Sequence, residues 1–432
     1  MNTEVLLTTV AEWLRGTALP DLTPREQPVP GPDDLKRVLA VVGPRRAGKT
    51  YFLYQMLAGL LRTGATRHDI LFVDFEDFRL REFQPEDMDR LLAAFYQTTG
   101  RAPRHLFFDE VQRIPEWSRV LRTLLNSRKY TLVVTGSNAR LLGSEIATEL
   151  RGRYEDRLIL PFSFREYLRL RGIAWDRALA ADPARGIIVK ALDDYLQNGG
   201  FPEAAGLPDE SARRRLMQSY FDTVFYKDVL DRHGIRARHL LDLIMRGMLE
   251  AYAAPFSISA FERRLKAHGQ AGSKRSIAEY LRSMEEAFFI VTTEKFDYSP
   301  RKRMMNPRKV YLMDTGFALL GGAFTANRGR LLENVAAVEF IRNRRRILHF
   351  KGRHECDFIV QDGARPVEAW QVCWELHTGN AKREVGGLLE AWSTLKIKTG
   401  GILTYNQEEQ RTVDGIIIPV RPVWKWLLDP EM

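Results

Sequence analysis

The chain has 432 residues, of which 45% are hydrophobic and 28% are charged, and this length favours two to four domains with cores of their own. No stretch approaches the roughly 18 uninterrupted apolar residues of a membrane-spanning helix, and the only cysteines, Cys356 and Cys373, exclude a disulfide framework and a cysteine-based zinc site. The net charge of +10 favours a polyanionic partner, although many basic chains are basic only for solubility.

Residues 2–16 predict an amphipathic helix that contains acidic and polar residues. It does not fit a secretory signal, so we expect a cytoplasmic protein. The prolines within 20–32 indicate an extended tether. Short apolar strands then alternate with helical stretches, and the strands are expected at 37–43, 69–77, 104–110, 130–138 and 156–162. This alternation is typical of an α/β fold, in which helices cover both faces of a parallel sheet.

The second half of the chain has a different pattern. Residues 163–238 are mostly helical, and we expect a long helix next, a short helix from Ser259 and a further helix with Ser273 as its N-cap. Two strands joined by the basic turn 297–308 complete a predicted winged helix. Another helix and several strands after 321 form a small α/β unit. The expected domains are an N-terminal helix and tether (1–36), a core (37–162), a helical lid (163–238), the winged helix (239–320) and the terminal unit (321–432).

Residues 43–50, GPRRAGKT, fit the phosphate-binding pattern G-x-x-x-x-G-K-[ST] between a predicted strand and a predicted helix. Backbone N–H groups at the start of a helix bind phosphate, a lysine reaches the β- and γ-phosphates, and a hydroxyl ligates Mg²⁺. The alternative is a tight turn with an incidental lysine. We therefore expect ATP and Mg²⁺ as ligands, and the expected nucleotide contacts are Gly43, Arg46, Ala47, Gly48, Lys49, Thr50 and Tyr51.

The strand at 104–110 ends in an acidic pair that fits hydrolysis of the nucleotide. Asp109 is expected to join Thr50 at the Mg²⁺, and Glu110 to accept a proton from the attacking water. The alternative is an acidic pair that only ends a strand. A further strand, 69–77, separates the loop from this pair in the sequence. That order favours the class of P-loop ATPases with an inserted strand and a catalytic glutamate, which includes motors and remodelling enzymes.

Three more residues are candidates for the reaction. Asn138 follows the next strand, where a polar side chain would lie beside the γ-phosphate, but asparagine is also common in turns. Arg151 and Arg153 precede the last strand of the core. In ring ATPases this position faces the nucleotide of the neighbouring subunit, where an arginine stabilises the charge on the transferred phosphoryl group. The alternative is a solvated basic turn.

The segments GPRRAGKT, LFFDEVQRIPEW, TGSNARLL, ELRGRY, GGFPE and YKDVL follow one another along the chain. In this order they resemble the AAA-type ATPases of bacteria and archaea that carry a C-terminal domain of long-unknown function. The resemblance extends from about residue 37 to near the C-terminus. It implies an ATPase core, a helical connection, a winged helix and a terminal domain of restriction-endonuclease type, but it leaves the substrate poorly defined.

The terminal domain departs from the PD-(D/E)XK nuclease pattern, in which carboxylates hold Mg²⁺ and a lysine positions water. Glu333 and Asp357 resemble the first two acids, but Gln371 and Cys373 occupy the positions of the third acid and the lysine. Moving the register to Glu368 does not help, because it places Trp370 at the lysine position. We therefore expect a nuclease-like fold without cleavage.

Clusters of basic residues indicate where DNA would bind. In the winged helix they are Lys274 and Arg275 of the second helix, with Arg301, Lys302 and Arg303 in the wing. In the terminal domain the expected contacts are Arg344, Arg345 and Arg346, in a cluster that also includes Arg342, Lys351 and Arg353. Solvated basic surfaces and protein-binding winged helices are the alternatives.

These features favour an ATP-driven motor that forms a ring, which we expect to be hexameric, and acts on duplex or branched DNA such as replication forks and Holliday junctions. Two alternatives stay open. One is an ATP-controlled switch that binds a protein partner in defence or stress signalling, and the other is an ATP-regulated nuclease. We expect no association with a membrane.

Overall fold

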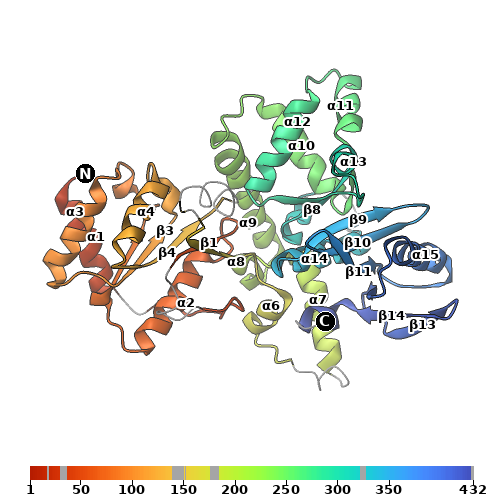
Figure 1. Cartoon of the computed structure of the whole chain (residues 1–432), viewed down its shortest axis with the longest axis horizontal. Coiled ribbons are helices and arrows are strands. Elements are labelled where there is room, and N and C mark those ends of the chain that lie inside the picture. The colour runs from red at the N-terminus through yellow and green to blue at the C-terminus, as the bar shows by residue number, and fades with distance from the viewer. Residues whose placement is uncertain are drawn as a thin grey trace. The chain divides into compact units, whose positions relative to one another are not determined.

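The computed structural model describes residues 1–16, 19–29, 37–138, 150, 152–175, 184–321 and 327–429. They form two compact units, Met1–Leu160 and Pro161–Met432, coloured red to yellow and yellow to blue in Figure 1. None of the described helices is both long and apolar enough to cross a membrane.

A five-stranded parallel sheet forms the centre of the first unit, as the sequence predicted. Its strands lie in the order β2-β3-β4-β1-β5, and their bounds are β1 (Val38–Val42), β2 (Ile70–Asp74), β3 (His105–Asp109), β4 (Thr131–Gly136) and β5 (Tyr154–Leu158). The strand that separates β1 from β3 in the sheet is β4. The strand that lies between them in the sequence, β2, is instead at the outer edge.

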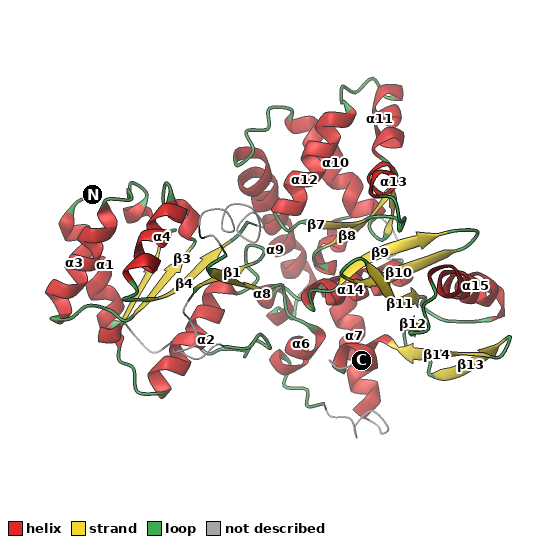
Figure 2. Ribbon diagram, viewed as in Figure 1, coloured by secondary structure: helices red, strands yellow, loops and turns green. Residues whose placement is uncertain are grey.

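Helices cover both faces of this sheet, as Figure 2 shows. They are α1 (Thr3–Arg15), α2 (Lys49–Arg62), α3 (Asp87–Thr99) and α4 (Trp117–Ser127), with short 3₁₀ turns at Arg67–Asp69, Phe78–Leu80 and Val111–Arg113. Apolar side chains of α2 pack on those of β1, β3 and β4. Helix α1 packs against α3 and β2, and the Trp13 indole donates a hydrogen bond to the Ile70 carbonyl at 2.5 Å. The N-terminal helix is therefore part of this unit.

The second unit begins with helices, as predicted for 163–238. They are α6 (Phe164–Leu170), α7 (Ala184–Asn198), α8 (Pro202–Gly206), α9 (Glu210–Thr223) and a π-helical continuation at Val224–Asp231. Ser163 caps α6: its hydroxyl accepts from the Glu166 N–H, and the Glu166 carboxylate accepts from the Ser163 N–H. One apolar core extends from Phe164 to Leu428 and joins these helices to the rest of the unit.

A three-stranded antiparallel sheet with helices follows. Its elements are α10 (Arg238–Ala251), β6 (Ala254–Phe256), α11 (Ile258–Ala267), α12 (Lys274–Glu286), β7 (Ile290–Thr293), α13 (Pro300–Met305) and β8 (Arg308–Leu312), and the strand order is β6-β8-β7. Ser273 caps α12 as predicted. Helix α11 begins at Ile258, one residue before the expected start at Ser259, and Ser257 is its N-cap. The connection between β7 and β8 was expected as a turn. It contains the short helix α13, because Ser299 supplies an N-cap and Pro300 suits the first helical position.

The chain ends in a six-stranded mixed sheet with the order β13-β14-β12-β11-β10-β9. Its elements are α14 (Arg328–Arg342), β9 (Arg346–Lys351), β10 (Glu355–Asp362), β11 (Arg365–Val372), α15 (Thr378–Leu395), β12 (Gly400–Thr404), β13 (Glu409–Val413), β14 (Ile416–Pro422) and α16 (Val423–Leu428), preceded by a 3₁₀ helix at Thr315–Leu320. Strand β13 was not predicted, because its polar sequence EQRTV lies at the sheet edge and lacks an apolar run.

Candidate nucleotide site

The predicted phosphate loop connects the end of β1 to the start of α2. Gly48 is the N-cap of α2 and has a φ of 92°, a conformation that glycine adopts without steric cost. Gly43 lies against the backbone beyond β5, where an added Cβ would be 1.9 Å from the Ile159 carbonyl oxygen. The loop therefore requires glycine at both positions. Its backbone geometry at a helix N-terminus suits an anion.

Lys49 and Thr50 point from the first turn of α2 toward the end of β3. The Thr50 hydroxyl donates to Asp109 Oδ2 at 2.6 Å, and the Thr135 hydroxyl of β4 donates to the other oxygen of the same carboxylate. The Lys49 ammonium lies 3.1 Å from the Pro44 carbonyl oxygen and 3.4 Å from Glu110 Oε1. The structure thus brings together the residues that the sequence predicted for phosphate and metal.

Glu110 is held in place from several sides. Its backbone is left-handed, with a φ of 51°, and its N–H donates to the Thr135 hydroxyl at 2.8 Å. Its carboxylate accepts hydrogen bonds from Ser137 at 3.0 Å and from the side chain of Gln112. Only 7% of Glu110 is exposed. The positive φ is unfavourable for a non-glycine residue and is maintained by these contacts.

The two carboxylates of the acidic pair differ in their affinity for protons. Burial raises the pKa of Asp109 to about 6, against the effect of its hydrogen bonds from Thr135 and Thr50. Burial also acts on Glu110, but the positive charges of Lys49 and Arg45 outweigh it and lower the pKa of Glu110 to about 2. Glu110 is therefore ionised when Lys49 lies beside it.

The rim of the loop carries its own ion pairs. Arg45 lies 2.6 Å from Glu76, and Arg113 lies 3.1 Å from the same carboxylate. Arg46 is exposed and has a φ of 64°. Tyr51 is 51% exposed on the first turn of α2, and its ring contacts that of Tyr54 edge-on.

Sequence reasoning missed Arg25, which lies within the predicted tether. It is buried, and its guanidinium donates to the Ala47 carbonyl at 2.7 Å and to the Leu160 carbonyl at 2.5 Å. Its backbone N–H donates to the side chain of Gln55 at 2.8 Å. Arg25 therefore joins the phosphate loop, α2 and the segment after β5. Gln112 was also missed. Thr135 and Ser137 belong to the segment at the end of β4 whose polar side chains were expected beside the γ-phosphate, but their bonds to Asp109 and Glu110 were not predicted.

The remaining candidates of the core are Asn138, Arg151 and Arg153. Asn138 follows β4 and is half-buried, while Arg151 lies outside the described residues. Arg153 precedes β5, and its guanidinium donates to the Asn126 side chain at 2.9 Å. Because β5 runs parallel to β1, Arg153 lies at the edge of the sheet opposite the loop, roughly 16 Å away along a five-residue strand.

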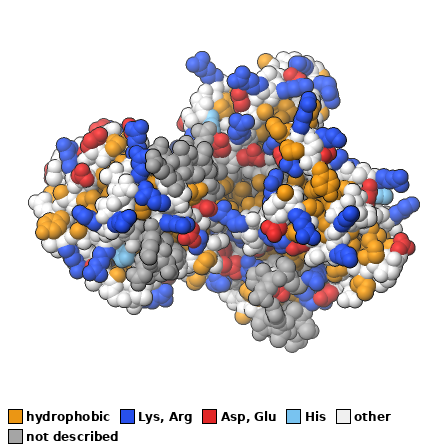
Figure 3. Space-filling model, viewed as in Figure 1, with side chains coloured by type: hydrophobic (Ala, Val, Ile, Leu, Met, Phe, Trp, Pro, Cys, Tyr) orange, Lys and Arg blue, Asp and Glu red, His pale blue; other side chains and the backbone are white. Residues whose placement is uncertain are grey.

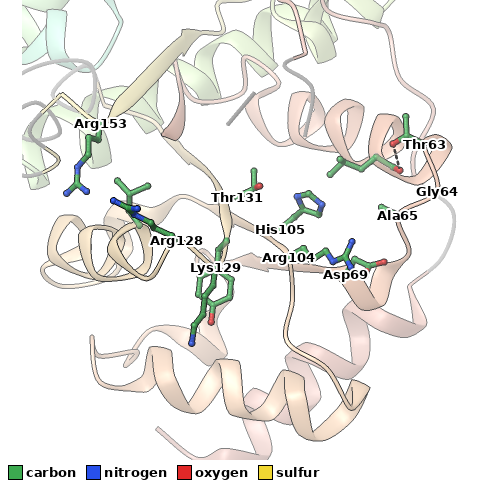
Figure 4. A pocket seen from close by; sticks show the side chains of 13 residues that line it. Thr63, Gly64, Ala65, Asp69, Arg104, His105, Arg128, Lys129, Thr131 and Arg153 are labelled. Atoms are coloured by element: carbon green, nitrogen blue, oxygen red, sulfur yellow. Dashed lines mark hydrogen bonds between the residues drawn. The ribbon is translucent and has the colours of Figure 1, made fainter. Parts of the chain in front are cut away.

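At that opposite edge Arg153 lines an open groove with a volume of about 910 Å³. Figure 4 shows the groove at the starts of the strands, with Arg153 and Arg128 at one end and Asp69 and Thr63 toward the other. Arg104 and Lys129 add further positive charge.

The predicted DNA contacts of the second unit fall into two groups. Lys274, Arg301 and Lys302 are exposed, and Arg275 is exposed but forms an ion pair with Glu279. Arg303 is turned inward: it donates to the Asp297 carbonyl at 3.0 Å and lies 3.7 Å from Glu294. A nearby carboxylate and carbonyl thus hold the Arg303 guanidinium in this structure, and its contact with DNA stays a prediction.

The terminal cluster is divided in the same way. Arg344 and Arg346 are exposed, but Arg345 lies 2.5 Å from Glu368, and the buried Arg342 bonds to Glu339 and the Pro161 carbonyl. On the face drawn in Figure 3, Lys and Arg side chains are spread over both units with acidic side chains among them. This face therefore does not present a single basic band.

The nuclease-like residues do meet in space. Glu333 of α14 and Asp357 of β10 contact the same ammonium group, that of Lys309 on β8. Gln371 of β11 accepts a hydrogen bond from the Asp357 N–H at 3.2 Å, and Cys373 is buried nearby in the terminal core. The residues that the sequence grouped together therefore do lie close to one another, but their contact with Lys309 was not predicted. In the described part of the chain, no group of three or more His, Cys, Asp or Glu side chains could hold a metal ion.

Comparison with known proteins assigns the first unit. Residues 35–168 match the model of a family described as an AAA domain, and residues 189–323 match a domain of unknown function, DUF8612. The uncharacterized protein MJ1544 of Methanocaldococcus jannaschii is 30% identical over 403 residues, which cover 91% of this chain and 88% of that protein. The chain belongs to the MJ1544 family. Its first unit is an AAA-type ATPase domain.

Another relative of this MJ1544-family protein is an uncharacterized protein of Haemophilus influenzae, 26% identical over 397 residues that cover 91% of this chain and 95% of the relative. Among solved structures, the Walker-type ATPase paby2304 of Pyrococcus abyssi is 14% identical with a TM-score of 0.34, covering 73% of this chain and 94% of that one. Cdc6p of Pyrobaculum aerophilum is 10% identical with a TM-score of 0.24, covering 78% and 93%.

Proposed function

We propose that this protein hydrolyses ATP and uses the energy to move or remodel DNA as a ring of subunits. The proposal of ATP hydrolysis rests on the arrangement around Glu110. This buried carboxylate is held by Ser137 and Gln112 beside the lysine of the phosphate loop. A carboxylate that is fixed within reach of the phosphate position suits a general base that activates water.

The residues at the loop also fit Mg²⁺. Thr50 and Asp109 offer a hydroxyl and a carboxylate to the same point, which matches the oxygen ligands that Mg²⁺ prefers. A bound Mg²⁺ would neutralise charge on the β- and γ-phosphates. Lys49 would leave Pro44 and Glu110 and bind phosphate oxygens. The Asp109 carboxylate would bind the metal instead of accepting the hydrogen bond from Thr50. Glu110 would accept a proton from the attacking water.

The position of Arg153 supports a ring. It lies at the sheet edge opposite the loop of its own unit, so it can approach a nucleotide only if that nucleotide belongs to another subunit. The open groove beside it leaves room for such an approach (Figure 4). We keep Arg153, with Arg151, as candidates for an arginine that acts across the interface. A hexamer is the ring we expect.

The proposal of DNA as partner rests on the second unit. The order α10, β6, α11, α12, β7, α13, β8 with the sheet β6-β8-β7 supports a winged helix with a short helix in its wing. The second helix of such a domain commonly enters a DNA groove. Lys274 on α12 and Arg301 and Lys302 on α13 are exposed where phosphate contacts would be made. Arg344 and Arg346 offer a second exposed group, and two groups per subunit would favour branched DNA such as forks and four-way junctions over linear duplex.

ATP turnover with and without DNA tests this proposal. We expect DNA to stimulate turnover, with a binding constant that falls steeply as salt rises and depends little on base sequence. The double variant Arg301→Ala/Lys302→Ala should weaken binding and reduce the slope of log K against log salt by about 2, because two phosphate contacts are lost, each worth about 0.9 in the slope. Lys396→Ala/Lys398→Ala, which removes two exposed lysines after α15, is the matched control.

Basal ATP turnover in all of these variants should equal that of the parent protein, since none of the residues lies at the loop. If the protein hydrolyses ATP but neither binds DNA at low salt nor responds to it, the motor is excluded, and the ATP-controlled switch for a protein partner becomes the better explanation. The other alternative, a nuclease, is disfavoured because the Lys309 ammonium contacts the two carboxylates expected to hold its metal.

A further inference from the structure

Lys309 lies in a cluster of charged side chains where the three-stranded sheet meets the terminal domain. Its ammonium is 2.7 Å from Glu355, 2.8 Å from Asp357 and 3.0 Å from Glu333. Only 2% of its side chain is exposed. The Tyr311 hydroxyl, two residues along β8, donates to the same Glu333 oxygen at 2.8 Å. One ammonium group on strand β8 thus forms ion pairs with three carboxylates of the terminal domain.

The chemistry of this cluster resembles that of a metal site with an ammonium in place of the metal. A lysine has three N–H donors, and each of the three carboxylates is within hydrogen-bonding distance of the nitrogen. Glu333 and Asp357 are the residues that the sequence placed at a nuclease metal. The other oxygen of Asp357 accepts from the Val372 N–H at 2.9 Å, and the amide of Gln371 donates to Glu384 at 2.6 Å. These groups are therefore already paired within the chain.

Burial explains why a cation is needed here. A buried carboxylate without a partner is strongly unfavourable, and here three acidic groups converge. Lys309 is itself buried, and burial opposes its charge, but Asp357 and Glu333 raise its pKa well above the usual value. The ammonium therefore stays charged over the whole pH range in which the carboxyl groups ionise.

We propose that Lys309 is a built-in counterion that takes the place of the divalent cation, and that the cluster fastens the terminal domain to the three-stranded sheet instead of cleaving DNA. Neighbouring contacts serve the same junction. The side chain of Asn334 bonds both the N–H and the carbonyl of Leu312 at 2.8 Å, and the Phe296 N–H donates to the His349 carbonyl at 2.7 Å. The two regions would move as one body during any ATP-driven work.

The first test is made on the unaltered full-length chain and on Asp357→Asn. Titration with Mn²⁺, followed by electron paramagnetic resonance in the absence of nucleotide, should give the same binding curve for both proteins. Neither protein should cleave plasmid or branched DNA with Mg²⁺ or Mn²⁺. A Mn²⁺ site or a cleavage activity that Asp357→Asn removes would overturn the proposal.

The second test is a double-mutant cycle measured by thermal unfolding. Lys309→Met should lower the melting temperature of the second unit by roughly 6–20 °C, because it leaves buried carboxylates without their cation. Adding Glu333→Gln should recover part of this loss, since it removes one of the acidic groups that converge on the missing ammonium. Lys398→Met, at an exposed lysine, should leave the melting temperature unchanged.

An unchanged melting temperature for Lys309→Met, or two losses that simply add in the double variant, would contradict the counterion role. If Lys309→Met does not fold, the metal titration of the unaltered chain still decides whether the site takes a divalent cation. ATP turnover is not a readout in either experiment, so failure of the DNA motor would leave this proposal intact.

Discussion

Arg25 offers a sharp test of how the phosphate loop is held. Arg25→Met removes the guanidinium but keeps much of the apolar stem. The structure shows two charged hydrogen bonds to backbone carbonyls, at Ala47 and Leu160, and both carbonyls would lose this donor. At about 1.5–3 kcal/mol for each hydrogen bond to a charged group, we expect a loss of about 3–6 kcal/mol in the free energy of unfolding of the first unit.

Part of that loss should appear as weaker nucleotide binding, because the Ala47 carbonyl belongs to the loop itself. If about 1.4 kcal/mol of it acts on the loop conformation that binds phosphate, the Kd for ATP rises about tenfold. Isothermal titration calorimetry gives the Kd, and thermal unfolding without nucleotide gives the stability. Arg62→Met, at an exposed arginine that ends α2, is the control and should change neither.

Melting temperature and ATP affinity that both stay at the parent values would refute the role of Arg25. A fall in melting temperature with unchanged affinity would show that Arg25 stabilises the unit without shaping the loop. The two measurements together separate these roles.

Four further predictions concern ATP binding and hydrolysis. Lys49→Ala should abolish measurable ATP binding in calorimetry. Glu110→Gln should keep the parent affinity for ATP but lower turnover by a factor on the order of 10²–10⁴, because an amide cannot accept the proton of the attacking water. Full turnover in Glu110→Gln would mean that another residue is the base. Asp109 must be ionised to bind Mg²⁺, so its pKa of about 6 predicts that Mg²⁺-dependent turnover falls as pH drops below about 6. Turnover that stays constant down to pH 5 would contradict this role of Asp109. Arg153→Ala should lose turnover but keep ATP binding, and mixing it with Glu110→Gln protein should restore some activity; intact mixed rings without activity would argue against action across subunits.

Local sequence patterns were sufficient for β1 to β4, the loop and the acidic pair. These four strands are short apolar runs, the loop begins directly after β1, and the acidic pair lies at the end of β3. Strand β5 has the polar sequence YEDRL and lies at Tyr154–Leu158, shifted from the expected 156–162. The spatial order of the strands was not available from the same patterns. Sequence order places β2 between the loop and the acidic strand, but pairing of backbone groups puts β4 there.

Arg25 and Lys309 could not be predicted, because their partners are distant in the sequence. Arg25 bonds to carbonyls 22 and 135 positions away, within a proline-containing stretch that has no periodicity. Lys309 meets Asp357 48 positions away. One signal existed for Lys309: in β8, RKVYL, it alternates with Val310 and shares a face with Tyr311, so a strand buried on both faces would have to bury the lysine. A buried lysine requires carboxylates.

Lys49 and Glu110 are a second buried pair of opposite charges. While Lys49 lies 3.4 Å from Glu110, its positive charge holds the pKa of the carboxyl near 2, too low for an effective proton acceptor. Burial acts in the opposite direction. If a bound nucleotide draws the Lys49 ammonium to its phosphates, the effect of burial dominates and the pKa of Glu110 rises. Glu110 would then be a stronger base at the step in which water is activated.

Stability against pH tests this coupling without nucleotide. A carboxyl whose pKa is lowered in the folded state contributes stability above its unfolded pKa, near 4.5, and that contribution is lost as pH falls toward about 2. Lys49→Met removes the main source of the lowering. The parent should therefore exceed Lys49→Met in melting temperature most clearly at pH 7, and the difference should narrow between about pH 5 and pH 3. A difference that does not depend on pH would mean that Lys49 stabilises the loop by packing alone, and that it does not control the base.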